Sequence, residues 1–349
     1  MKVVVIGASG NAGTGVLRAL RDADDVTEVV AVARRVPRRT PPEPYDVASW
    51  VRADVADPAP GRALATLTQA MQGADAVIHL AWAIQPNHDR ALLRRTNVDG
   101  TARVLEAARG AGVGHVVVAS SVGAYSPAHD DERHNETWPT HGIPASEYSV
   151  DKADVEALLD AHERDHPEVT VTRLRPALIF QRHAGAQMLR YFLGRWMPGV
   201  AFTGALPVLP WPEGLRLQAV HADDVGRAYL QAVRHRAAGA FNVAGPGVVD
   251  AREAADILAG GRYREVPVPL VRATVSAGWN AHALPVSPGW IDMGIAVPLM
   301  STAKARDQWG WEPRHTAADA VRSVVAGIAH GAGTASPPLR PRRPRDRFS

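Results

Sequence analysis

Tyr148 and Lys152 lie four residues apart in the stretch Glu-Tyr-Ser-Val-Asp-Lys. In a helix, this spacing places the two side chains on one face, one turn apart. A phenol has a pKa of about 10, but a neighbouring ammonium group favours the phenolate and lowers that pKa. The pair is therefore a candidate general acid and base for a carbonyl or alcohol oxygen. Because the same spacing also occurs by chance on surface helices, the interpretation depends on the rest of the chain.

The composition is that of a chain that can bury a large core. It has 349 residues, 46% of them hydrophobic, enough for one large domain or two that share an interface. Cysteine is absent, which excludes disulfides and thiolate metal sites, and no other residues show the spacing of a metal site. No apolar run approaches the about 18 residues of a membrane span, and no leader precedes the first strand. We therefore expect a cytoplasmic protein without a metal or a membrane segment.

Most of the excess positive charge lies at the C-terminal end. The formal net charge is +3, but residues 340–349 hold five Arg and one Asp, which leaves 34 basic and 35 acidic residues elsewhere. A body this close to neutrality argues against a nucleic-acid surface. Gly, Pro and Ser punctuate the sequence from Gly331 onward. We expect residues 331–349 to form a disordered, dispensable Arg/Pro-rich tail.

A glycine-rich turn near the N-terminus is the second candidate site. The β-branched run at residues 2–6 leads directly into Gly-Ala-Ser-Gly-Asn-Ala-Gly, and apolar residues at helical spacing follow. In such a strand–turn–helix unit, glycines let the backbone turn tightly and approach a pyrophosphate, whose charge the helix N-terminus favours. The sequence therefore predicts a dinucleotide-binding turn. Its predicted contacts are Gly7, Ser9, Gly10, Asn11, Ala12 and Gly13.

The next predicted strand, residues 29–33, ends at Arg34 and Arg35. An acidic residue at this place normally binds the ribose hydroxyls of NAD, and Ala33 cannot do so. Arg34 or Arg35 can pair with a 2′-phosphate instead, so the sequence favours NADP over NAD. The alternative is that the two Arg residues only open a basic, Pro-rich loop.

The remaining pattern alternates strands with helices. We expect further strands that end at Asp54 and that span residues 74–81 and 113–119. This alternation predicts an α/β fold with a doubly wound parallel sheet. The strand at 113–119 runs into Ser120 and Ser121. Because the carboxyl ends of parallel strands share one edge, where ligands bind, Ser121 should lie close to the helix that carries Tyr148.

With these elements in place, the chain resembles the extended short-chain dehydrogenases/reductases of the NAD-dependent epimerase/dehydratase group. The resemblance extends to about residue 330 and follows the family's order of motifs. Beyond the three glycines, the matches are Asp54, His79-Leu-Ala81, Asn97-Val-Asp-Gly100, Ser121 with Tyr125, Tyr148 with Lys152, Arg175-Pro176, Val220-His-Ala-Asp-Asp224, Phe241-Asn-Val243 and Trp309-Gly-Trp-Glu-Pro313. Ala12 departs from the bulkier apolar residue that is common at its position.

The resemblance implies a Rossmann sheet with a smaller, interleaved C-terminal substrate domain. The dinucleotide-binding domain would comprise residues 1–176 and 218–245. The substrate domain would comprise residues 177–217 and 246–330. The family also implies a homodimer, joined through helices near residues 101–110 and 149–163.

The resemblance assigns a role to each site residue. Tyr148 would transfer the proton of the substrate oxygen, Lys152 would lower the Tyr148 pKa and bind the nicotinamide ribose, and Ser121 would orient the oxygen. Asp54 and Val55 would contact the adenine. The remaining cofactor contacts would be Leu80, Ala81, Asn97 and Pro176, with Ala81 and Asn97 on the nicotinamide side. Two alternatives stay open, namely that Asn97 only caps a helix and that Ser121 only caps a turn.

The resemblance says less about the substrate. Sugar-nucleotide members often carry Arg-Asp-Tyr where this chain has Leu217-Gln-Ala219, and Arg216 lies one residue out. The segments that face the site are instead rich in large rings, which suit a hydrophobic or aromatic carbonyl compound but also suit plain packing. These rings are Trp82, Trp138, Phe180, Tyr191, Trp196, Trp211, Trp279 and Trp290. We predict substrate contacts from Trp82, Tyr125, Trp138 and Phe180.

Together these features predict an NADP-dependent oxidoreductase that transfers hydride between the nicotinamide and a small-molecule ketone, aldehyde or secondary alcohol. The first alternative is a nucleotide-sugar epimerase or dehydratase with bound NAD. The second is a dinucleotide sensor that binds cofactor and a protein partner without turnover, although intact Ser121, Tyr148 and Lys152 argue against it. Exchangeable NADPH would distinguish the reductase from an epimerase, which retains its NAD.

Overall fold

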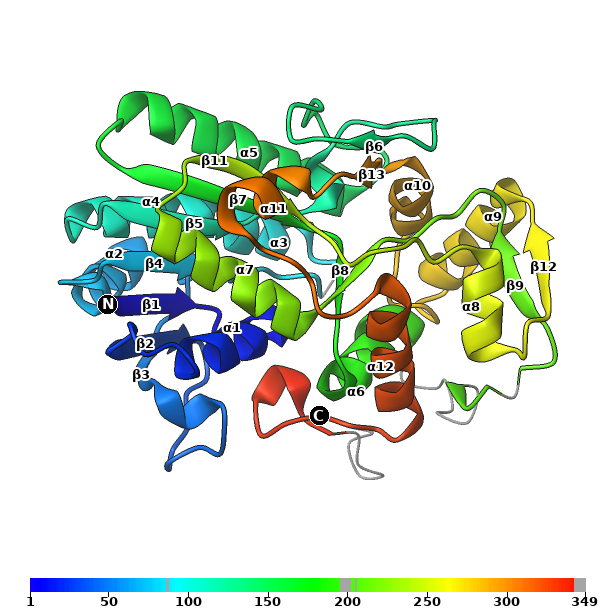
Figure 1. Cartoon of the computed structure of the whole chain (residues 1–349), viewed down its shortest axis with the longest axis horizontal. Coiled ribbons are helices and arrows are strands. Elements are labelled where there is room, and N and C mark those ends of the chain that lie inside the picture. The colour runs from blue at the N-terminus through cyan, green and yellow to red at the C-terminus, as the bar shows by residue number, and fades with distance from the viewer. Residues whose placement is uncertain (86–87, 195–201, 205, 342–349) are drawn as a thin grey trace.

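The computed structural model describes residues 1–85, 88–194, 202–204 and 206–341. Its centre is a sheet of seven parallel strands in the order β3-β2-β1-β4-β5-β7-β11. The strands are β1 (Lys2–Ile6), β2 (Glu28–Ala33), β3 (Ser49–Arg52), β4 (Ala76–His79), β5 (His115–Ala119), β7 (Thr170–Pro176) and β11 (Gly239–Val243). The chain builds one side of the sheet through β2 and β3, then crosses to β4 and builds the other, so the switch point lies between β1 and β4 (Figure 1).

Alternating side chains divide the apolar core between the two faces of this sheet. Val3 and Val5 of β1 contribute to the core on one face, and Val4 and Ile6 to the core on the other, as the two-residue period of a strand requires. Helices α1 (Asn11–Arg21), α7 (Ala222–His235) and α11 (Ala303–Trp309) pack on the first face, and α2 (Pro60–Met71), α4 (Gly100–Gly110) and α5 (Glu147–Asp165) on the second. The prediction of a doubly wound α/β fold is confirmed.

Smaller sheets and helices lie beside the carboxyl ends of the main strands (Figure 1). Strand β8 (Leu178–Phe180) pairs with β10 (Ala219–His221), β9 (Leu209–Pro212) with β12 (Tyr263–Val266), and β13 (Leu299–Met300) with β6 (Arg133–His134). The helices are α3 (Arg90–Arg94), α6 (Gly185–Met188), α8 (Ala251–Leu258), α9 (Val268–Asn280), α10 (Gly289–Ala296) and α12 (Ala317–Ala329), with π-helical turns at Arg95–Asp99 and Leu189–Leu193. None of the helices in the described ranges is long and apolar enough to cross a membrane.

The segment with α11 differs from the expected domain assignment. We placed residues 246–330 in the substrate domain, but Phe241 of β11 stacks on Trp309 with 3.8 Å between the ring centroids. Trp311 and Ala305 belong to the same buried cluster as β1 and α1. Residues 303–311 therefore pack against the dinucleotide-binding side of the molecule, because their aromatic rings complete its core.

The residues after α12 also differ from expectation. We expected disorder from Gly331 onward, but the residues up to Pro341 are folded onto the body. Leu339 is completely buried within the turn Pro337–Leu339, and the Ser336 hydroxyl donates a hydrogen bond to the Ser9 carbonyl. A buried apolar anchor explains why this stretch is ordered despite its polar and Pro-rich composition. Residues 342–349, which carry most of the Arg cluster, lie outside the described residues.

Candidate active site

A cavity of about 630 Å³ lies at the carboxyl ends of β1, β2 and β5 and extends to α10. The sheet's switch point explains why segments far apart in the chain meet here. The cavity is lined by most of the residues predicted from the sequence, namely Gly7, Ser9, Gly10, Asn11, Ala12, Gly13, Arg34, Arg35, Asp54, Val55, Leu80, Ala81, Trp82, Ser121, Tyr148, Lys152, Pro176 and Phe180.

The glycine turn between β1 and α1 forms one end of the cavity. Gly7 has a φ of +85°, and a Cβ atom there would lie 2.7 Å from the backbone nitrogen of Ala81, so only glycine fits. Gly10 is the N-cap of α1, and no side chain among the described residues caps it. The first amides of α1 and the positive end of its dipole therefore remain directed at the cavity. Such a cradle fits the diphosphate of a dinucleotide.

The side chains of Arg34 and Arg35 place two cations at this end of the cavity. Arg34 and Arg35 directly follow β2, are exposed and line the wall. Asp54 also lines the wall, but its carboxylate accepts a hydrogen bond of 3.0 Å from the Ala56 amide within its own turn. An anionic group of a ligand at this end would therefore meet two guanidinium groups.

Serine hydrogen bonds fix the first turn of α5, which carries Tyr148, against the loop after β5. Ser146 caps α5 by accepting a hydrogen bond of 3.4 Å from the Ser149 amide, and the Ser149 hydroxyl donates to the Gly123 carbonyl. A Cβ atom at Gly123 would lie 2.9 Å from Cε1 of Tyr148, so glycine lets the ring approach this loop. Tyr148 and Ser121 consequently line the same cavity, where Ser121 acts to lower the Tyr148 pKa. The predicted convergence of these two residues is seen in the structure.

The acidity of Tyr148 differs from the expectation. Burial raises the pKa of Tyr148 to about 12, and Ser121 acts in the opposite direction. We expected Lys152 to lower this pKa, but its Nζ lies 5.9 Å from the centroid of the Tyr148 ring. Tyr148 is therefore protonated at neutral pH, which is the form required of a general acid.

The Lys152 ammonium group is held by an aromatic ring and a carbonyl. Its Nζ donates a hydrogen bond of 2.8 Å to the Ala119 oxygen and lies 3.4 Å from the centroid of the Trp82 ring, a cation–π contact. The residue is only 2% exposed, and burial lowers the pKa of Lys152 to about 7, whereas Glu156 and Asp151 raise it. The charge of Lys152 is thus sensitive to its carboxylate neighbours near neutral pH.

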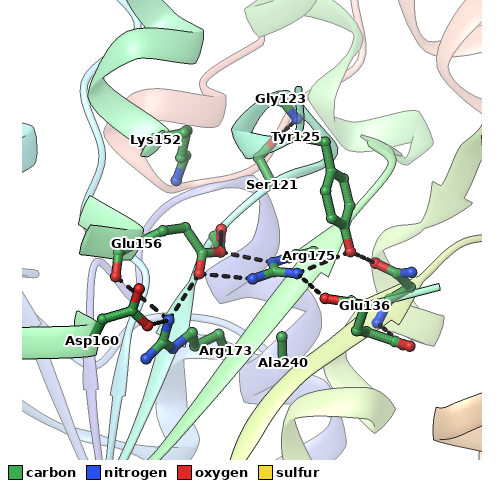
Figure 2. Close-up of polar contacts among 12 residues, drawn as sticks. Ser121, Gly123, Tyr125, Glu136, Lys152, Glu156, Asp160, Arg173, Arg175 and Ala240 are labelled. Carbon is green, nitrogen blue, oxygen red and sulfur yellow. Dashed lines mark hydrogen bonds and ion pairs between the residues drawn. The ribbon is translucent and has the colours of Figure 1, made fainter. Parts of the chain in front are cut away.

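A buried carboxylate lies one helical turn beyond Lys152 (Figure 2). Glu156, which is 1% exposed, accepts hydrogen bonds of 2.8 and 2.9 Å from Arg175 and one of 3.1 Å from Arg173. The Ser120 hydroxyl, next to Ser121 in sequence, donates to the same carboxylate. Burial opposes ionisation, but the Arg175 guanidinium outweighs it and lowers the pKa of Glu156 to about 2. Glu156 is not among the site residues predicted from the sequence, although its four-residue spacing from Lys152 is visible there.

Tyr125 does not line the cavity, contrary to prediction. Its side chain is completely buried, and its hydroxyl donates a hydrogen bond of 2.7 Å to Asn242 Oδ1 and accepts one of 3.0 Å from Arg175 (Figure 2). Burial raises the pKa of Tyr125 to about 12. Tyr125 therefore supports the guanidinium that holds Glu156.

Trp138 and Asn97 also lie outside the cavity wall. The Trp138 indole donates a hydrogen bond of 3.0 Å to the Ser126 carbonyl, and its ring packs against the core on the α1 side of the sheet. The Asn97 amide accepts a hydrogen bond of 2.8 Å from the Ala83 nitrogen and donates one of 3.0 Å to the Ala83 oxygen. Asn97 thus fixes the loop after β4, which carries Trp82 into the cavity, and does not act as a simple helix cap.

Aromatic and aliphatic side chains form the other end of the cavity. The ring centroids of Trp82 and Tyr148 are 5.8 Å apart, those of Tyr148 and Trp290 are 4.9 Å apart, and Phe192 meets Trp290 edge-on at 5.0 Å. Apolar or aromatic residues that complete this end are Ile84, Tyr191, Leu215, Leu217, Ile291 and Met293. Trp211 and Trp279 do not line the cavity, and Trp196 lies outside the described residues.

Comparisons with known proteins agree with this architecture. A family model described as the NAD dependent epimerase/dehydratase family matches residues 3–244. An uncharacterized protein of Mycobacterium tuberculosis (strain ATCC 25618 / H37Rv) is 28% identical over 331 residues, which are 94% of this chain but only 30% of the relative's length. The 2'-dehydrokanamycin reductase of Streptomyces kanamyceticus is 32% identical over 231 residues, 66% of this chain and 57% of that protein.

Solved structures show the same fold. MoeE5 in complex with UDP-glucuronic acid and NAD aligns with a TM-score of 0.67 at 23% identity, covering 94% of this chain and 98% of that chain. UDP-glucose 4-epimerase of Thermus thermophilus, in complex with NAD, aligns with a TM-score of 0.66 at 22% identity, covering 94% and 99%. Because the family model spans well over half of the sequence, and the glycine turn and the Ser121, Tyr148 and Lys152 cluster meet in one cavity, the chain belongs to the NAD-dependent epimerase/dehydratase family.

Proposed function

We propose that this protein is an NADP-dependent oxidoreductase that reduces an apolar ketone or aldehyde, or oxidises the corresponding alcohol. One observation carries the proposal. A single cavity joins a diphosphate cradle and two Arg residues at one end to Ser121, Tyr148 and Lys152 in the middle and to aromatic rings at the other end.

The chain's own residues account for the proton. In the reductive direction, the substrate carbonyl accepts a hydrogen bond from Ser121 and from protonated Tyr148, and Tyr148 gives its proton to the oxygen as the carbon is reduced. The nicotinamide, when bound, supplies the hydride in this direction and accepts it in the other. A protonated Lys152 stabilises the negative charge that Tyr148 acquires. The rings of Trp82 and Trp290 flank Tyr148 and keep water away from the transfer.

Arg34 and Arg35 support the choice of NADP. Both line the glycine end of the cavity, and the strand before them ends in Ala33 rather than in an acidic residue. A guanidinium group binds a phosphate through charge-assisted hydrogen bonds, whereas a carboxylate at this place would repel it.

A nucleotide-sugar epimerase or dehydratase with bound NAD is the alternative, because MoeE5 and the Thermus enzyme carry NAD, and MoeE5 a UDP-sugar. A sugar-nucleotide diphosphate calls for a cation on the substrate side. Arg216 does not provide one, since it binds the Asp130 carbonyl and the Asp131 carboxylate. Among the described residues, the cations that line the cavity are Arg34, Arg35 and Lys152, so the aromatic end favours an apolar substrate.

Cofactor stoichiometry and turnover test the proposal. Denatured samples of the purified protein should release less than one equivalent of dinucleotide, and added NADPH should be oxidised in the presence of aromatic or aliphatic ketones and aldehydes. One equivalent of retained NAD together with conversion of a UDP-sugar would establish the alternative. We also expect the protein to be cytoplasmic and to form a homodimer through α4 and α5. Analytical sedimentation tests the dimer.

A further inference from the structure

Residues 334–340, here called the C-terminal strap, form a compact turn. The Thr334 amide donates a hydrogen bond of 2.8 Å to the Leu339 carbonyl, and the Leu339 amide donates one of 3.0 Å to the Ser336 carbonyl. Ser336 is 5% exposed and Leu339 is completely buried. A Cβ atom at Gly333 would lie 2.2 Å from the Leu339 oxygen, so glycine permits the chain to enter this turn. The strap is therefore a folded part of the molecule.

One side of the strap contacts the glycine turn of the cofactor cradle. The Ser336 hydroxyl donates a hydrogen bond of 2.5 Å to the carbonyl of Ser9. The Tyr45 hydroxyl bridges the Thr334 hydroxyl at 2.7 Å and the Thr14 hydroxyl at 3.0 Å. Tyr45 is 2% exposed, so this bridge is shielded from water. The strap is thus tied both to the glycine turn and to the first turns of α1.

The other side of the strap contacts the segment that forms the aromatic end of the cavity. Arg190 donates hydrogen bonds of 2.8 Å to the Pro338 carbonyl and 3.2 Å to the Arg340 carbonyl. The two residues after Arg190, Tyr191 and Phe192, line the cavity, and so does Pro338 itself. The strap consequently contacts both the glycine turn and the segment on the substrate side, and it lines the cavity through Pro338.

We propose that the C-terminal strap is a wall of the dinucleotide site that holds the glycine turn in place and slows release of the bound cofactor. This inference rests on the proposed function, because it assumes that a dinucleotide diphosphate binds at the glycine turn. The physical reason is that Ser336 fixes the Ser9 carbonyl, while the uncharged Pro338 lines the cavity. A turn fixed in advance loses less conformational freedom when the ligand binds.

Two truncations test the strap as a whole, and one point substitution in the full chain tests its hydrogen bond to Ser9. Stopping the chain after Gly333 removes the strap, whereas stopping it after Pro341 keeps the strap and is the matched control. Ser336→Ala removes only the hydrogen bond to Ser9, and Ser276→Ala, on α9 away from the cavity, is its control. For each variant, Kd values for NADPH and NADH are measured by fluorescence titration, dissociation rates by stopped flow, and Tm without cofactor.

Loss of one hydrogen bond corresponds to a weakening of dinucleotide binding by about 2- to 10-fold. We expect Ser336→Ala to raise the Kd for the dinucleotide by about this factor, mainly through faster dissociation, and the truncation after Gly333 to raise it further. Both controls should match the wild type. If Ser336→Ala keeps the wild-type Kd and dissociation rate, the strap proposal is overturned, whatever happens to Tm. If the wild-type protein binds neither dinucleotide, the proposed function fails, and the strap proposal fails with it.

Discussion

Glu156 lies one helical turn after Lys152 on α5, and its buried carboxylate raises the Lys152 pKa that burial lowers to about 7 (Figure 2). The carboxylate itself is held ionised by Arg175 and hydrogen-bonded by Ser120. Glu156 therefore supports the charge of Lys152 without lining the cavity itself. In the proposed reaction Glu156 would be a positioning residue, since it reaches the substrate only through Lys152 and the loop with Ser121.

Glu156→Gln should shift the pH dependence of turnover. Lys152 must be protonated to stabilise the Tyr148 phenolate, so the reduction rate should fall as pH rises through about 7 in the wild type. Without the Glu156 charge the pKa of Lys152 falls further, and the loss of rate should move to lower pH. The measurement is kcat/KM against pH. A pH profile identical to the wild type would contradict this role.

Asp160→Asn is the matched control for that experiment. Asp160 also pairs with Arg173, but its side chain is 63% exposed and lies one turn further from Lys152. Removal of the Asp160 charge should leave the dependence of kcat/KM on pH unchanged. Glu156→Gln should in addition lower the free energy of unfolding by about 3 to 5 kcal/mol, because the buried Arg175 guanidinium loses its counter-charge. Chemical denaturation measures this loss separately from the pH profile.

Tyr148→Phe should abolish most of the turnover without affecting cofactor binding. The ring keeps its contacts with Trp82 and Trp290, but the proton donor is lost, which corresponds to a decrease of about 10²- to 10⁴-fold in kcat. The dinucleotide Kd should stay within twofold of the wild type, about 0.4 kcal/mol. Tyr263→Phe, at a tyrosine that is 44% exposed, serves as the control. Undiminished turnover in Tyr148→Phe would rule out the assigned general acid.

Replacing Arg34 and Arg35 together by Ala should weaken NADPH binding and leave NADH binding nearly unchanged. Each lost charge-assisted hydrogen bond corresponds to roughly 1.5 to 3 kcal/mol, or about a 10- to 100-fold change in Kd. The matched control is the double Ala variant of Arg38 and Arg39, which are exposed in the same loop but do not line the cavity. Equal affinities of the wild type for NADPH and NADH would end the NADP assignment.

Lys152 should make the free energy of unfolding depend on pH. Its pKa is about 7 in the folded protein and 10.5 as the ordinary value, so between these limits the unfolded chain binds more protons than the folded one. The contribution of Lys152 to stability therefore rises with pH in this window, by up to about 1.4 kcal/mol per pH unit. Lys152→Met should remove this slope, and Lys2→Met, at a surface lysine paired with Glu28, should not. The measurement is denaturant titration at several pH values. If the wild type, Lys152→Met and Lys2→Met all show the same pH dependence of the unfolding free energy, the prediction is wrong.

Local sequence patterns determined much of the architecture and the chemistry. The β-branched run before Gly7 and the glycine spacing after it predicted a strand, a turn and a helix, because backbone conformation there depends on which residues tolerate a positive φ and which favour an extended chain. The four-residue spacing of Tyr148 and Lys152 predicted a shared helix face for the same kind of local reason. Parallel strand order then sufficed to predict that Ser121 meets Tyr148.

Only the tertiary structure decided which rings and charges reach the site. Tyr125 and Trp138 look like site residues in the sequence, but long-range partners such as Arg175 and the Ser126 carbonyl turn them away from the cavity. Trp82 covers Lys152, and the depth of that pocket, not the neighbouring ammonium, sets the Tyr148 pKa. Leu339 orders a segment whose composition indicates disorder. Burial and hydrogen-bond partners come from residues distant in sequence, and no local pattern encodes them.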